Sequence, residues 1–227
     1  MLFVALFFAE LIVLFVLSKI LTKRLSSLIY RVTRNKSVTI YIMALLFFPG
    51  TLLHELAHFI MAGVLLVRVY TFELVPKLEG DYVKLGSVSV AQSDIFRRFF
   101  IGIAPFLFGT FLLLSFLYYA VSNSLFENYI FILLMGYAAF EIGNTMFSSK
   151  KDMEGALELI GVVAFFVVVF YFIGLRLPEG TFTKIFENPT VLQIFQRGSI
   201  FLLFPLVVDG LVLGILSFFS PQKAFKN

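Results

Sequence analysis

The chain has 227 residues, of which 60% are hydrophobic and only 14% are charged, and its mean hydropathy is +0.98. About half of the residues of a soluble domain are apolar, so this composition excludes an ordinary soluble protein. The net charge of +4 is modest, and the charges cluster at the ends of apolar segments, which favours contact with lipid headgroups over nucleic-acid binding. We therefore expect an integral membrane protein that crosses the bilayer several times; its oligomeric state cannot be read from the sequence.

About six segments have the length of a membrane-spanning helix. They cover residues 1–21, 38–67, 94–119, 129–147, 152–175 and 191–219. Basic residues follow the first segment rather than precede it, which is the reverse of a cleavable signal peptide, so we expect this helix to be retained. Pro49 and Gly50 should kink or interrupt the second segment. Because no linker or internal repeat is found, residues 1–227 are expected to form a single all-α, polytopic membrane domain.

Residues 68–92 follow a different pattern. Apolar and polar residues alternate on both sides of a polar interruption formed by Pro76 and Glu79-Gly80-Asp81. Short alternating runs separated by turn residues are typical of paired strands. The sequence therefore predicts a small, membrane-associated β-hairpin directly after the second helix.

The second segment carries His54-Glu55-Leu56-Ala57-His58, an H-E-x-x-H motif. On a helix, residues four apart lie on one face, so both imidazoles can bind one metal ion, with Glu55 as general base. The chain has no other histidine and no cysteine, so it cannot build a closed structural zinc site. Two histidines, a carboxylate and an open position are typical of catalytic zinc. We expect one Zn²⁺ per chain.

Residue types alone offer six candidates for the third ligand. Acidic candidates at membrane depth or at a helix start are Glu10, Glu141, Asp152, Glu154, Glu158 and Asp209. Asp152 also fits a capping position at the start of the fifth segment, where a carboxylate favours the helix N-terminus. Glu10 and Asp209 have no predicted role beyond structural contacts.

Four features together resemble the site-2 proteases, a family of intramembrane zinc metalloproteases. These are HELAH in an early helix, a hairpin after it, Gly102-Ile103-Ala104-Pro105 in the next helix, and Asn144 followed eight residues later by Asp152. The second motif of the family reads N-x-x-P-x-x-x-x-D-G. The resemblance implies that Asp152 is the third zinc ligand and that Asn144 helps to hold the substrate carbonyl. It covers about residues 38–175 and leaves extra helices at both ends.

The chain departs from the family pattern at two positions of this second motif. Phe147 stands in place of the proline, and Met153 stands in place of the glycine. The assignment of Asp152 therefore has two alternatives, Glu141 and Glu154.

The resemblance implies a zinc-dependent endopeptidase that cleaves membrane-protein substrates within or near their transmembrane segments. Glu55 would accept a proton from the attacking water, and Asn144 would join zinc in stabilising the oxyanion. The unwound substrate needs hydrogen-bond partners at membrane depth, which an edge of the hairpin can supply. Two alternatives stay open: a non-catalytic zinc-binding or chaperone-like membrane protein, and a membrane zinc protease with a glutamate ligand. The expected location is the plasma membrane of a prokaryote.

Overall fold

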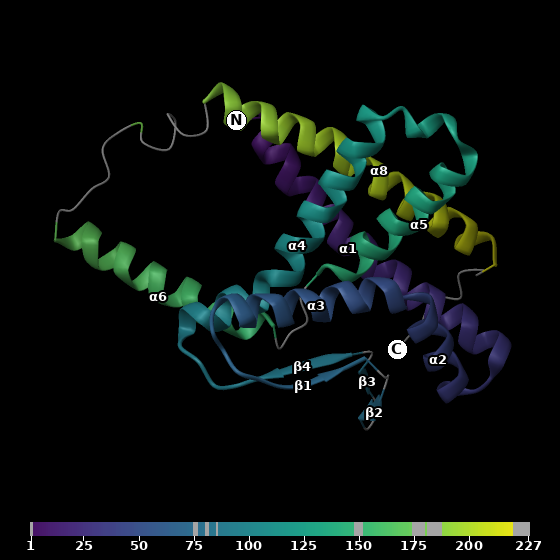
Figure 1. Cartoon of the computed structure of the whole chain (residues 1–227), viewed down its shortest axis with the longest axis horizontal. Coiled ribbons are helices and arrows are strands. Elements are labelled where there is room, and N and C mark those ends of the chain that lie inside the picture. The colour runs from purple at the N-terminus through teal and green to yellow at the C-terminus, as the bar shows by residue number, and fades with distance from the viewer. Residues whose placement is uncertain are drawn as a thin grey trace, which may run out of the picture.

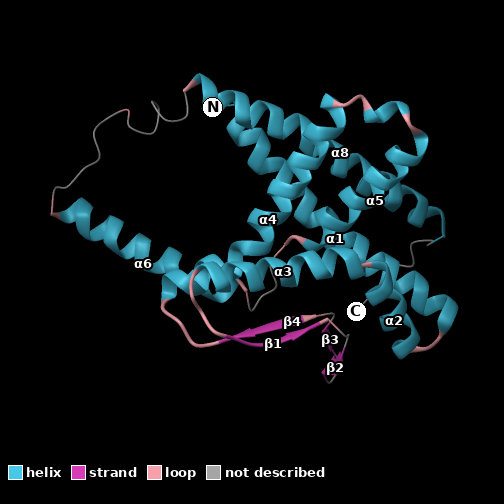
Figure 2. Cartoon of the chain, in the orientation of Figure 1, coloured by secondary structure: helices cyan, strands magenta, loops and turns pink. Residues whose placement is uncertain are grey.

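The structure is a computed structural model that describes residues 2–74, 77–79, 82–84, 86–147, 152–173, 180 and 188–219, with the backbone alone at residues 77–79, 82–84, 153–157, 160 and 219. The elements, in chain order, are α1 (Leu2–Thr33), α2 (Lys36–Leu46), α3 (Phe48–Val64), β1 (Val69–Glu73), β2 (Lys77–Glu79), β3 (Tyr82–Lys84), β4 (Ser87–Val90), α4 (Ile95–Ser122), the short 3₁₀ helix η1 (Leu125–Glu127), α5 (Tyr129–Thr145), α6 (Met153–Phe172) and α8 (Pro189–Phe219). Helices make up most of the protein (Figures 1 and 2).

Three helices, α1, α4 and α8, are long and apolar enough to cross a membrane. The bent pair of α2 and α3 makes a fourth candidate if the two are taken as one span. The expectation of a mainly helical membrane protein is confirmed at this level. Among the described residues, α5 and the apolar part of α6 are shorter than these spans, so the expected number of six is not reached by length and composition.

The core lies where α1, α4, α5 and α8 meet. Phe7 on α1 packs edge to face against Phe195 on α8, with 5.3 Å between the ring centroids. Further along both helices, Leu14 and Pro205 each lie beside Gly143 of α5. These two contacts show that α1 and α8 run in the same direction, side by side (Figure 1). Since Leu14 is fully buried, this seam is part of the hydrophobic core.

The second predicted segment is two helices rather than one. The chain bends by 70° at Phe47, between α2 and α3. Pro49 lies in the first turn of α3, where its missing N–H leaves no helical hydrogen bond unmade. Phe47 itself is buried and stacks on Phe140 of α5 at 5.5 Å. The expected interruption before the H-E-x-x-H motif is confirmed, and the buried ring holds it in place.

The predicted hairpin is present as antiparallel strands beneath α3 (Figure 2). β1 pairs with β4, with Val69 opposite Val90 and Glu73 opposite Ser87, and β2 pairs with β3. Both β1 and β4 contact α3, the helix that carries the motif. The loop after β4 ends at Asp94, which accepts a hydrogen bond from the Arg97 N–H as the cap of α4, and this bond lowers the pKa of the Asp94 carboxyl.

Candidate metal centre

The two histidines of α3 present the same ring nitrogen to a common point. His54 Nε2 and His58 Nε2 lie 3.3 Å apart. Each Nδ1 is 2.7 Å from a backbone carbonyl oxygen, that of Thr145 for His54 and that of Ile101 for His58. Because a carbonyl only accepts, each Nδ1 carries the proton and each Nε2 keeps its lone pair. This is how metal-binding histidines are usually oriented.

Asp152 completes the group. Its Oδ2 lies 3.6 Å from His54 Nε2, and its Oδ1 lies 3.5 Å from His58 Nε2. One ligand atom from each of the three residues falls within 4.8 Å of the others. Tetrahedral zinc ligands at about 2.0–2.1 Å from the ion are about 3.3 Å from one another. The observed separations of 3.3–3.6 Å therefore fit the donor set of one Zn²⁺.

The structure argues against a capping role for Asp152. This residue stands directly before α6, but its backbone is already helical (φ −65°, ψ −31°) and its side chain makes no capping hydrogen bond. The carboxylate is turned toward α3 instead. Its side chain is 18% exposed, and those of His54 and His58 are 13% and 8% exposed, so all three groups are largely removed from solvent.

Two irregularities in neighbouring helices supply the carbonyls that orient the histidines. Thr145 is the last residue of α5, and the final carbonyls of a helix have no partner within it. Ile101 lies in the interior of α4, but the residue four positions later is Pro105, which has no N–H to donate. Reasoning from motifs missed both acceptors because they are backbone atoms. The helix end and the proline were the only signals in the sequence.

Glu55 is a residue of α3, and its side chain lies against strand β4. The residue is 8% exposed, and its carboxylate accepts a hydrogen bond from the backbone N–H of Val88. A Cβ on Gly86 would lie 3.0 Å from Glu55 Cγ, so the glycine allows the chain just before β4 to pass close to the glutamate. The carboxylate is in electrostatic contact with His54 and Asp152. The structure thus places the predicted general base beside the predicted ligands.

Asn144 is bound to another helix. Its Nδ2 donates to Asp209 Oδ1 on α8 and to the carbonyl of Phe140, both at 2.8 Å. Ser18 on α1 donates to the Asn144 carbonyl at 3.1 Å. The side chain therefore links α5 to α8, and its role at a substrate carbonyl stays a prediction. The hydrogen bond from Asn144 also gives Asp209 a structural partner, which the sequence alone did not identify.

The other acidic candidates are placed away from the histidine pair wherever their side chains are described. Glu141 is 2% exposed and accepts a hydrogen bond of 3.0 Å from the backbone N–H of Gly50. Glu158 pairs with Arg98 of α4 at 2.7 Å. The side chain of Glu154 lies outside the described residues. Among the carboxylates that are described, Asp152 is the one that joins the histidines.

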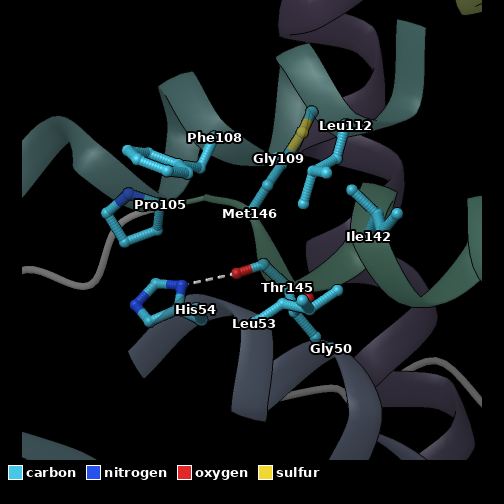
Figure 3. Close-up of a pocket in the computed structure, with 10 residues that line it drawn as sticks. All are labelled: Gly50, Leu53, His54, Pro105, Phe108, Gly109, Leu112, Ile142, Thr145 and Met146. Atoms are coloured by element: carbon cyan, nitrogen blue, oxygen red, sulfur yellow. Dashed lines mark hydrogen bonds between the residues drawn. The ribbon is translucent and has the colours of Figure 1, made fainter. Parts of the chain in front are cut away.

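A small cavity lies on the Nδ1 side of His54, with room for about one water molecule. Figure 3 shows it between the ring of His54, with its bond to Thr145, and apolar side chains such as Phe108 of α4 and Met146, which directly follows α5. The Nε2 atoms that face Asp152 are on the other side of the ring. The cavity is therefore a small packing gap behind the ring of His54, and any metal would bind outside it.

Comparison of the chain with protein-family models, with curated proteins and with solved structures finds no match in any of the three.

Proposed function

We propose that this protein is an intramembrane zinc metalloprotease of the site-2 protease type, which hydrolyses peptide bonds within or near the transmembrane segments of other membrane proteins. The observation that carries the proposal is the convergence of His54, His58 and Asp152, with Glu55 beside them, in a protein whose helices are of membrane length. The proposal includes six membrane crossings, with α5 and α6 among them, and the plasma membrane of a prokaryote as its location.

The roles of the residues follow from their chemistry. His54, His58 and Asp152 would hold the zinc ion, which when bound acts as a Lewis acid and lowers the pKa of a water ligand to about 7. Glu55 accepts the proton of the attacking water and delivers it to the leaving nitrogen, as a general base and then a general acid. The hydrogen bond from Val88 holds the carboxylate in place for both transfers.

Among the described residues, no strand pairs with β4 on the side away from β1, and this free edge supports binding of the substrate in extended form. The N–H of Ala91 donates to Arg68 on the β1 side of the sheet, whereas that of Val88 points to the opposite side, toward Glu55. Since successive residues of a strand alternate in direction, the N–H of Val90 also lies on the edge away from β1. A substrate segment that unwinds beside Glu55 would find the N–H of Val90 as a donor at membrane depth.

The test measures zinc content and cleavage in the detergent-purified full chain. Wild type should contain one zinc, Glu55→Gln should retain it, and Asp152→Ala should lose it. A matched control is Glu158→Ala, which removes a carboxylate of α6 that pairs with Arg98. Cleavage of single-span test proteins should occur with wild type and the control and be absent in Glu55→Gln and Asp152→Ala.

Each contrary result points to a different alternative. Zinc that persists in Asp152→Ala would overturn the ligand assignment and favour a protease with a glutamate ligand. Zinc-loaded wild type that cleaves none of a panel of single-span proteins would overturn the protease and favour a non-catalytic zinc-binding protein. If purified wild-type protein contained no zinc, the assignment of a zinc site would itself be wrong.

A further inference from the structure

Pro105 occupies an unusual position for a proline. It lies in the middle of α4, which runs without interruption from Ile95 to Ser122, and its side chain is fully buried. A proline inside a helix removes one hydrogen bond and pushes its ring against the carbonyl four residues earlier. In a membrane, a carbonyl released in this way must find another donor.

That carbonyl belongs to Ile101, and its donor is a side chain of the metal centre. His58 Nδ1 lies 2.7 Å from Ile101 O. The bond sets the tautomer of His58, since Nδ1 must carry the proton for the bond to form, and leaves Nε2 as the metal-facing atom. With any other residue at position 105, the backbone N–H would compete for the same carbonyl.

We propose that Pro105 is a positioning residue for the metal centre: by removing the helical partner of Ile101, it keeps that carbonyl available to orient His58. Pro105 touches neither metal nor substrate in this role and acts through the backbone. The inference rests on the metal centre of the proposed function and adds to it a residue outside the ligand set.

The test is Pro105→Ala in the detergent-purified full chain, with Pro205→Ala as the matched control. Pro205 is also fully buried in the interior of a long helix, α8, and the carbonyl four residues before it belongs to Phe201, outside the metal centre. Both variants restore a helical N–H and remove the same ring. Zinc affinity is measured by competition with a chromophoric chelator, and the geometry of the site by the visible absorption of the Co²⁺-substituted protein.

Loss of a partner that orients a ligand typically weakens metal binding by about 10- to 100-fold. We expect a decrease of that size and an altered Co²⁺ spectrum in Pro105→Ala, and wild-type affinity and spectrum in Pro205→Ala. Equal zinc affinity in the two variants would overturn the inference, whether both match wild type or both are weakened. Because no substrate is needed, this result would leave the proposed function standing, whereas zinc binding without cleavage would overturn only that function.

Discussion

Gly102 offers the sharpest test of how the metal centre is assembled, because it lies where α4 meets the start of α6. A Cβ built on Gly102 would overlap the carbonyl oxygen of Asp152 and come within 3.1 Å of its carbonyl carbon. The atoms in contact are backbone, so no side-chain rotation relieves the overlap. Gly102→Ala must therefore move the N-terminal end of α6 or the facing turn of α4.

The normal contact distance sets the size of this movement. Carbon and carbonyl oxygen atoms in contact are normally about 3.3–3.6 Å apart, so the Asp152 carbonyl has to retreat by more than about 1 Å. Ligand distances at a metal site are tolerated within about 0.2 Å. Asp152 would then no longer bind an ion held by the two histidines. Since the loss of an outer partner already weakens binding by about 10- to 100-fold, displacement of a ligand should cost at least as much.

The assay is zinc competition in the purified chain, with Gly161→Ala as the control. Gly161 lies on α6, the same helix that begins after Asp152, and a Cβ there would meet nothing within 4 Å. Alanine in a helix interior is favoured over glycine by about 0.5–1 kcal/mol, so the control should fold at least as well as wild type. Wild-type zinc affinity in Gly102→Ala would show that the junction of α4 and α6 does not position Asp152, and would refute the reasoning.

Three further predictions concern other contacts of the site. Val90→Pro removes a donor from the free edge of β4 and should abolish cleavage while the zinc content stays unchanged. The control Val90→Ala keeps the N–H and should cleave the substrate. Cleavage by the proline variant would exclude substrate pairing with this edge. Glu141→Leu strips the Gly50 N–H of its acceptor and should lower the free energy of unfolding in mixed micelles by about 1–3 kcal/mol, whereas Glu141→Gln keeps an acceptor and should be milder. Asp209→Leu leaves the Asn144 amide without its partner on α8 and should cost a similar free energy in the same titration; a variant as stable as wild type would show that the contact is dispensable.

The parts of the site that could be predicted from the sequence are those with a local signal. Helical spacing places His54 and His58 on one face, whatever their helix packs against. Pro49 predicts the break in the helix before them. Asp152 was reached by resemblance, and the geometry of the histidine pair now supports it independently. Local patterns suffice in these cases because each depends on residues within one or two helical turns.

The remaining features depend on contacts or on backbone atoms, which carry no such signal. The first helix was expected to end near Leu21, but α1 continues to Thr33, because Lys23 and Arg24 end the apolar run without disfavouring helix. The partner of Asn144 is Asp209, 65 residues away on α8. No periodicity relates two such positions. The carbonyls that orient the histidines belong to ordinary residues and emerge only when the helices are packed.

The helix irregularities around the site share one physical logic. Irregular backbone at membrane depth is tolerated only where the released polar groups find new partners. The break before α3 exposes the N–H of Gly50, which donates a hydrogen bond to Glu141. The end of α5 exposes the carbonyl of Thr145, which accepts a hydrogen bond from His54. The proline in α4 exposes a third group, the carbonyl that binds His58. Each irregularity is therefore stabilised by a side chain of the site or of the helices around it, and each histidine is oriented by an irregularity. Restoring any one of these helices to regular geometry should loosen the metal centre even where no ligand is changed.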